Sequence, residues 1–352
     1  MAECDIVGWD IGGAHVKACL IQGGLVRDVT QWPCPLWQGT EELERALGLA
    51  LARWPGMARA QHAVTMTGEM VDLFKDREDG VLRIAALLAS TLPAPRFYAG
   101  RGGWCAAAEV ARHWQDIASA NWLATAQHVA TTRPRAAGML VDIGSTTTDL
   151  IAFDRGHVPT ASRGDAERLA RSELVYLGVV RTPLCALAQH IAWRGNELNV
   201  MNEFFATSAD VYRLTGELPA AHDQHPSADN GGKDIAATQA RLARMIGLDA
   251  RDGSADEWWA FAGAWRAQQV AHLRGQLERA IAAHALPADA TIVSAGCGDF
   301  LVPELAPPGW RCLHYGRDIA RIAPDAAAGT QEWAQVCAPS VAVAALFELE
   351  PA

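Results

Sequence analysis

The sequence predicts an α/β protein made of two related halves, each with a mixed sheet and covering helices. Two segments repeat one pattern of Asp, glycine and polar residues, Asp-Ile-Gly-Gly-Ala-His-Val-Lys at 10–17 and Asp-Ile-Gly-Ser-Thr-Thr-Thr-Asp at 142–149. Each segment directly follows a short apolar run, as a buried strand entering a tight turn would. A third glycine turn, Gly-Cys-Gly at 296–298, follows the strand-like run 290–295. A duplicated strand–turn–strand unit therefore organises the predicted fold.

The first half alternates strand and helix patterns. Thr40 precedes an acidic first turn and apolar residues at helical spacing, which is typical of a capped helix. Pro93 and Pro95 separate a later helix from a short strand. We expect strands at 6–9, 16–21, 25–29, 63–67 and 96–98, and helices at 41–54, 79–92 and 104–124.

The second half begins with a strand at 139–141 and its returning strand at 150–153. The stretch 163–251 matches the first half poorly, so we expect a helical insertion that forms a substrate-facing wall. A long helix at 255–285, the strand at 290–295 and an apolar helix at 340–349 complete the pattern. This organisation predicts a first lobe at 1–137 and a second lobe, insertion included, at 138–352.

Composition limits the classes of partner. The chain has 352 residues, of which 50% are hydrophobic, a formal net charge of −10 and a pI near 5.5. An acidic chain with lysine only at 17, 75 and 233 is not expected to bind nucleic acid. The eight cysteines form no Cys-x-x-Cys pair, and no apolar run is long enough to cross a bilayer. We expect a cytoplasmic protein with small-molecule ligands and no membrane partner, and a homodimer is one of the oligomeric states left open.

The repeated turns have the residue types of a polyphosphate site. Glycine lets the main chain approach phosphate oxygens, and serine and threonine add hydroxyl donors. The Gly-Cys-Gly turn suits a loop that closes over a nucleotide base or ribose. The candidate binding residues are Gly12, Gly13, Lys17, Gly144, Ser145, Thr146, Thr147, Gly296 and Gly298.

The two aspartates that open the repeats suit a different task. A carboxylate repels phosphate directly, so Asp10 and Asp142 are expected to hold Mg2+ through water. Lys17 and Lys233 lie beside glycine turns and would add positive charge. A second metal hypothesis concerns His222, Asp223 and His225, although histidines in exposed polar loops commonly bind nothing.

The ordered set of motifs resembles the actin, sugar kinase and Hsp70 (ASKHA) superfamily. Within it, Asp10–Gly13, Thr67–Met70, Asp142–Asp149 and Ser294–Gly298 are similar to the hydantoinase A and oxoprolinase family, although this chain is shorter than those hydrolases. The closer resemblance, over nearly the full length, is to a short branch of that family linked to tetrahydromethanopterin-dependent one-carbon metabolism. It is carried by segments at 162–165, 176–183, 202–207, 209–213 and 228–234.

The resemblance implies a transferase of methanofuran or methylofuran biosynthesis. Such an enzyme would join an aminomethylfuran-methyl diphosphate to the phenol of a tyramine or tyrosine derivative, with loss of diphosphate. The twin loops and Mg2+ would stabilise the departing diphosphate, with Lys17 or Lys233 as a further cation. Glu69, Asp149 and Asp165, in that order, are the candidates to take the phenol proton.

Two alternatives stay open at this point. If the loops bind ATP, the protein would be an ATP-dependent hydrolase or kinase of the hydantoinase A and oxoprolinase type. A non-catalytic protein that binds a nucleotide and closes its lobes is the other possibility. Turnover of ATP, of a furfuryl diphosphate, or of neither distinguishes the three.

Overall fold

The computed structural model describes residues 5–350, and its first sheet confirms the expected strands of the first half. The strand order is β3-β2-β1-β4-β5-β6. The first three strands in this order pair antiparallel, β4 and β5 continue the sheet in parallel pairs, and β6 pairs antiparallel with β5. One face packs on three helices around a core that includes Trp9, Leu43 and Ile84. The strands are β1 (Ile6–Ile11), β2 (His15–Gln22), β3 (Leu25–Pro33), β4 (Gln61–Met66), β5 (Arg96–Tyr98) and β6 (Trp104–Ala106), and the helices are α1 (Glu41–Arg53), α2 (Arg77–Thr91) and α3 (Val110–Ile117).

The prediction of one helix over 104–124 is wrong. Residues 104–106 form strand β6, and the helical part is divided into α3 and α4 (Asn121–Thr132). The division falls at Ser119, whose φ of 51° is left-handed and ends a right-handed helix. The break places Ser119 and Asn121 in the lining of a cavity between the two lobes.

The second sheet repeats the hairpin of the first. Its strands are β7 (Ala137–Ile143), β8 (Thr148–Asp154), β9 (Leu174–Val175), β12 (Thr291–Ala295) and β13 (Arg311–His314), in the order β13-β12-β7-β8-β9. Asp10 pairs across the ladder with Lys17, and Asp142 pairs with Asp149. The same backbone bond closes both turns, from Gly12 N to His15 O at 2.9 Å and from Gly144 N to Thr147 O at 2.8 Å. The two sequence repeats are therefore one structural unit used twice.

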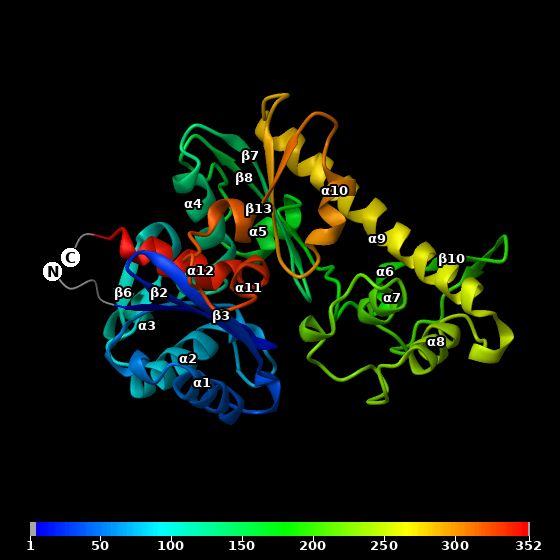
Figure 1. The fold of residues 1–352 in the computed structure, drawn as a ribbon, viewed down its shortest axis with the longest axis horizontal. Helices are drawn as coiled ribbons and strands as arrows, with labels where there is room; N and C mark the ends of the chain where they lie inside the picture. Colours follow the sequence, from blue (N-terminus) through cyan, green and yellow to red (C-terminus); the bar gives the residue numbers. More distant parts are fainter. Residues whose placement is uncertain (1–4, 351–352) are drawn as a thin grey trace.

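The insertion differs from the expectation in extent and content. Helix α5 (Asp165–Ala170) leads directly into β9, which belongs to the second sheet. Beyond it, helices alternate with a hairpin that was not predicted. These elements are α6 (Leu184–Leu187), β10 (His190–Trp193), β11 (Asn196–Asn199), α7 (Ser208–Leu214) and α8 (Ile235–Arg244). Figure 1 shows them along the long helix α9 (Ala255–His284), which confirms the helix expected at 255–285.

Helices α4 and α12 (Ala338–Glu348) join the two lobes. Helix α12 packs on β1, β2 and β4 of the first sheet although it lies at the end of the chain, and α4 contacts both α12 and β8. A continuous core therefore extends from the back of the first sheet to the second sheet. The lobe boundaries at 137 and 138 stay a prediction, but the last helix of the second segment is packed on the first sheet. The short helices α10 (Val302–Leu305) and α11 (Thr330–Val336) complete the second lobe.

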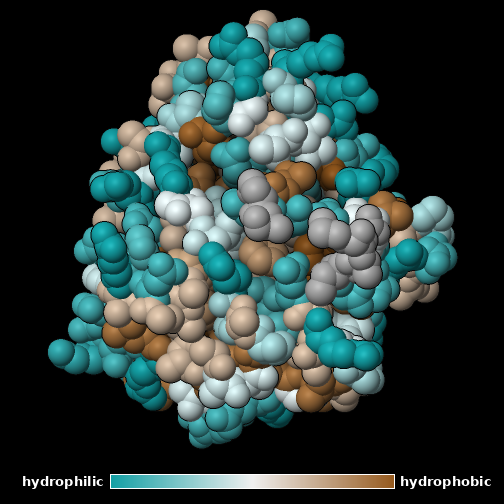
Figure 2. All heavy atoms as spheres, turned by 90° about the vertical axis from the view of Figure 1, so that its left-hand side faces the viewer, coloured by the Kyte–Doolittle hydropathy of each residue, from teal (hydrophilic) through white to brown (hydrophobic). Residues whose placement is uncertain are grey.

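The surface is mixed in character. On the face turned to the viewer in Figure 2, hydrophobic residues lie in small separate groups among hydrophilic ones. Within residues 5–350, no helix is both long and apolar enough to cross a membrane.

Candidate active site

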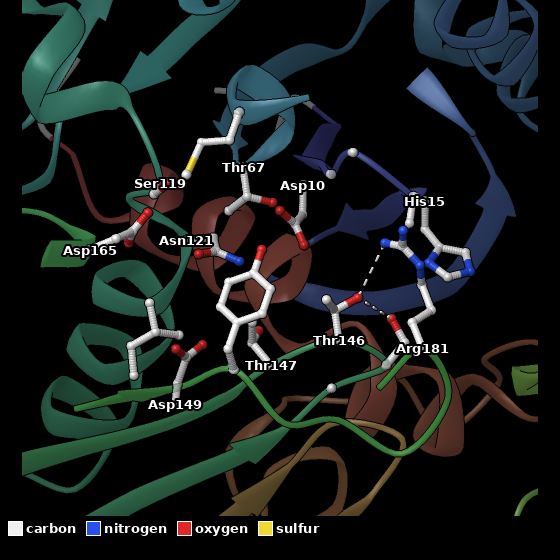
Figure 3. A pocket seen from close by; sticks show the side chains of 18 of the residues that line it. Asp10, His15, Thr67, Ser119, Asn121, Thr146, Thr147, Asp149, Asp165 and Arg181 are labelled. Atoms are coloured by element: carbon white, nitrogen blue, oxygen red, sulfur yellow. Dashed lines mark hydrogen bonds between the residues drawn. The ribbon is translucent and has the colours of Figure 1, made fainter. Parts of the chain in front are cut away.

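A cavity of about 290 Å³ lies where the two repeated hairpins face each other. The loop of β1 and β2 supplies one wall and the loop of β7 and β8 supplies another, as Figure 3 shows. Other walls come from the segment after β4, the break between α3 and α4, and the segment around β9. The candidate residues brought together in the lining are Asp10, Gly12, Gly13, Lys17, Gly144, Ser145, Thr146, Thr147, Asp149 and Asp165.

Asp10 and Lys17 form a charged pair at the end of the first hairpin. Lys17 Nζ lies 3.8 Å from Asp10 Oδ2, because β1 and β2 place the two residues opposite each other. Burial alone would lower the pKa of Lys17, but Asp10 and Asp142 outweigh it and raise that pKa to about 12. Oδ1 of Asp10 is buried and has no hydrogen-bond partner within the described residues. Lys17 is thus a permanent cation, while Asp10 keeps one oxygen for a ligand.

Asp142 lies beside the cavity and is not part of its lining. It is the penultimate residue of β7 and lies between Asp149 on β8 and Ala295 on β12. Burial, together with the carboxylates of Asp149 and Asp10, raises the pKa of Asp142 to about 7, against the opposing effect of Lys17. The structure therefore places the two predicted metal carboxylates unequally, with Asp10 in the wall and Asp142 behind it.

The third glycine turn is also outside the lining. Gly296 has a φ of 85°, and a Cβ there would overlap the backbone of Ile143 and the carboxylate of Asp142. Gly298 N donates to Ile143 O at 2.8 Å, and a Cβ on Gly298 would overlap the side chain of Ile143. Close packing on the end of β7 accounts for both glycines, so this turn supports the second hairpin from behind.

Asp149 and Asp165 form an acidic pair on the side of the cavity opposite Arg181 and His15 (Figure 3). Arg168 donates from Nη2 to Asp149 Oδ1 and from Nη1 to Asp165 Oδ1, the latter at 3.1 Å. The Arg168 guanidinium is buried against Trp122, with its carbon 4.4 Å from the ring centroid. Burial raises the pKa of Asp149, and Arg168 opposes this effect. The Arg168 hydrogen bond uses Oδ1 of Asp149, and no hydrogen bond within residues 5–350 involves Oδ2, so Oδ2 is the oxygen available to a ligand.

Glu69 lies behind the lining. Its side chain is completely buried, and its Oε1 accepts from Ser119 Oγ at 2.7 Å and from Arg77 Nη2 at 3.3 Å. Burial raises the pKa of Glu69, while the Ser119 hydrogen bond opposes this. Arg77 also lies 3.7 Å from Asp165 Oδ2. Glu69 therefore positions Ser119 and, through Arg77, Asp165, and it does not itself line the cavity.

Lys233 and the histidine cluster are placed elsewhere. Lys233 Nζ donates to the backbone and carboxylate oxygens of Asp223, at 2.6 and 3.0 Å, and is absent from the lining. His225 packs edge-on against His15, whereas His222 packs against Trp333. Asp223 is bound by Arg213 and Lys233. No group of three or more metal-type side chains is found in residues 5–350, so His222, Asp223 and His225 do not form a shared metal site.

Several lining residues were missed when the sequence was considered alone. Arg181 and Tyr176 come from the segment 176–183, which carried part of the family resemblance, and that resemblance was the signal that could have found them. Trp37, Met70 and Tyr176 are 39%, 53% and 62% exposed and give the cavity an apolar border. The further missed members of the lining are Ala14, His15, Thr67, Val71, Ser119, Asn121, Arg168 and Leu174.

Comparison with known proteins agrees with this architecture. A solved structure of nucleotide-free acetone carboxylase, described with ATP-dependent acetone carboxylation, aligns with a TM-score of 0.53 at 12% identity over 86% of this chain and 66% of its own. That alignment supports the ASKHA-type fold alone. The expected α/β architecture of this type is confirmed.

Two relatives are more similar in sequence, and both are named (4-{4-[2-(gamma-L-glutamylamino)ethyl]phenoxymethyl}furan-2-yl)methanamine synthase. The protein of Methanocaldococcus jannaschii is 31% identical over 258 residues, which cover 73% of this chain and 76% of the relative. The protein of Methanococcus vannielii is 33% identical over 119 residues, or 34% of this chain and about half, 53%, of the relative. These relatives confirm the prediction of an enzyme. Because the family model for hydantoinase/oxoprolinase matches residues 60–308 as well, the chain belongs to the hydantoinase/oxoprolinase family.

Proposed function

We propose that this enzyme condenses an aminomethylfuran-methyl diphosphate with the phenol of a tyramine or tyrosine derivative, releasing diphosphate, in the biosynthesis of a methanofuran-type cofactor. The relatives named as furan-methanamine synthases support the ether product. The observation that carries the proposal is the combination, in one cavity, of phosphate-type loops and an apolar border. Ser145, Thr146 and the loop glycines suit the diphosphate, whereas Met70 and Tyr176 suit furan and phenol rings.

The residues present also fit a magnesium ion. Asp10 lines a cavity that would receive a diphosphate, and its buried Oδ1 has no hydrogen-bond partner within residues 5–350. Mg2+ commonly uses one or two carboxylates together with substrate phosphates and water. Asp10 would hold the ion, with Asp142 as an outer partner. The ion would neutralise charge on the diphosphate oxygens.

The proposed reaction exchanges one carbon–oxygen bond for another. The bond from the furan methylene to the diphosphate oxygen breaks, its electron pair leaves with diphosphate, and the phenol oxygen bonds to the methylene carbon. Negative charge grows on the diphosphate as this bond breaks, so fixed donors from Ser145, Thr146 and Lys17 lower the barrier. The phenol proton passes to Asp149 Oδ2, the free oxygen of the lining carboxylate.

This order of bases revises the expectation that Glu69 acts first. Glu69 is completely buried behind Ser119, and both oxygens of Asp165 face arginine side chains. Asp149 is the candidate that both lines the cavity and keeps an oxygen without a hydrogen bond within the described structure. Asp165 and Glu69 are assigned to positioning.

The test is a product assay with purified enzyme and Mg2+. One reaction contains a furfuryl diphosphate and a tyramine derivative, and a parallel reaction contains ATP with the same phenol. Diphosphate release equal in amount to a new aryl ether, detected by mass spectrometry, is the expected result. Turnover of ATP without ether formation would instead support the ATP-dependent hydrolase or kinase. Nucleotide binding with no turnover of either kind would support the non-catalytic alternative.

A further inference from the structure

We infer that Arg181 is the anion anchor of the cavity and binds the diphosphate of the donor, with Trp37 of the first lobe covering its guanidinium. This inference deepens the proposed function and rests on it for the identity of the donor. Binding of inorganic diphosphate tests the assignment of the anion without the donor.

Arg181 is distinguished from the other cations of the lining by its partners. Lys17 is paired with Asp10, and Arg168 is paired with Asp149 and Asp165. Arg181 has no carboxylate within ion-pair distance among the described residues, although it is partly buried in the cavity wall. A guanidinium removed from water without an anion is unfavourable, so a bound oxyanion would stabilise it.

The hydrogen bonds of Arg181 leave most of its donors free. Nη1 donates to Thr146 Oγ1 at 3.4 Å, a long bond that Figure 3 shows as a dashed line. A guanidinium has five N–H donors in a planar fork that matches two oxygens of a phosphate group. Arg181 and Thr146 therefore face one volume of the cavity, where a single phosphate group would accept from both.

The backbone around Arg181 is built to hold it against the second loop. Arg181 N donates to Ser145 O at 2.8 Å, and Val180 N donates to the same oxygen at 3.1 Å. Gly178 permits this approach, because a Cβ there would overlap the backbone of Ser145 and Thr146. Thr182 Oγ1 accepts from Gly178 N at 2.8 Å and fixes the turn. The backbone at Arg181 is thus hydrogen-bonded to the second loop and closely packed against it.

Trp37 contributes from the opposite lobe. The Arg181 guanidinium carbon lies 5.0 Å from the centroid of the Trp37 ring, a cation–π distance. His15 lies beside them and is neutral, because burial and the nearby His225 lower its pKa well below the ordinary value. It therefore does not act as a second cation for the bound anion. The neighbourhood favours diphosphate over a carboxylate of the phenolic substrate, because Arg181 is bonded to the phosphate-type loop and Asp149 and Asp165 lie across the cavity.

The experiment measures binding of inorganic diphosphate in the presence of Mg2+ by isothermal titration calorimetry. Arg181→Met is expected to weaken the affinity by about 10- to 100-fold, because it removes charge-assisted hydrogen bonds. Arg181→Lys should recover part of the loss, since it restores the charge without the fork. The matched control is Arg251→Met, which removes an exposed arginine of the insertion and should bind diphosphate like the parent. Thermal unfolding of each variant checks that the fold is kept.

Steady-state kinetics distinguish the two groups that could supply the oxyanion, which are the diphosphate of the donor and a carboxylate of the phenol. For Arg181→Met, the KM of the diphosphate donor should rise while the KM of a carboxylate-bearing phenol stays constant. Unchanged diphosphate affinity, or a rise confined to the KM of the phenol, would overturn the inference.

Trp37→Leu should weaken diphosphate binding about 2- to 5-fold in the parent and have a smaller effect in the Arg181→Met background. Equal effects in both backgrounds would refute the part assigned to Trp37. Direct titration needs no turnover, so the anchor can be tested even if no ether forms.

Discussion

Replacement of Asp142 by asparagine should change how the stability of the enzyme depends on pH. The pKa of Asp142 is raised from its ordinary value of 3.8 to about 7, chiefly by burial and then by Asp149. The folded state therefore binds this proton more tightly than the unfolded chain. The resulting stabilisation is fully present below about pH 4 and is lost as pH rises through about 7. Asparagine has nearly the same shape and cannot ionise, so the variant should not show this loss.

The magnitude follows from the two pKa values. The gap between 3.8 and about 7 corresponds to about 4 kcal/mol of unfolding free energy. About 2.5 kcal/mol of this falls between about pH 5 and about pH 8. Relative to the parent, Asp142→Asn should therefore gain about 2.5 kcal/mol across that interval, whatever constant difference the amide introduces.

Urea unfolding at both pH values, with a chelator present to remove bound metal, measures this difference. Asp116→Asn, on an exposed face of α3, is the matched control and should give the same pH dependence as the parent. The stability difference between Asp142→Asn and the parent could instead be the same at both pH values. In that case the surroundings do not raise the pKa of Asp142 to near 7, and the electrostatic account of this position is wrong.

Three further predictions concern turnover and loop packing. Asp149→Asn should lower kcat by about 100- to 10,000-fold with little change in the KM of the diphosphate donor; a large rise in that KM with normal kcat would assign Asp149 to binding. Chelation of Mg2+ should abolish ether formation and added Mg2+ should restore it, whereas turnover insensitive to chelator would remove the metal from the proposal. Gly178→Ala should lower the melting temperature or diphosphate affinity because its Cβ overlaps the second loop, while Gly263→Ala in α9 has open space and should be neutral or stabilising. A calorimetric scan and a diphosphate titration measure both quantities. Equal melting temperatures and equal diphosphate affinities of Gly178→Ala and Gly263→Ala would show that close packing at Gly178 is not required.

The local pattern of the chain predicted the hairpins well because their information is local. Each Asp-Ile-Gly segment has its strand, turn and return strand within a few residues, and both turns closed as expected. The position of Ser119 shows the limit, since its left-handed φ split a helix that apolar spacing alone presents as continuous.

The candidate site was predictable where it lay in those hairpins and less so elsewhere. Glu69 follows a strand, as a lining carboxylate would, but its burial against Ser119 and Arg77 depends on the distant segment at 119. Arg181 becomes a site residue through backbone bonds to Ser145, and Gly296 becomes a packing residue through contact with Ile143. Such contacts join positions far apart in the chain, and spacing along the sequence carries no record of them.

The two copies of the hairpin carry opposite charges at their last motif position, so the two sides of the site are not equivalent. At the eighth position of the motif one copy has a lysine beside Asp10 and the other has an aspartate beside Asp142. Two identical halves would present the same charge from both walls and would accept an elongated ligand equally well in either orientation. The opposite charges of Lys17 and Asp149 remove that equivalence, so a molecule with an anionic head and a ring at its other end has one preferred way to enter.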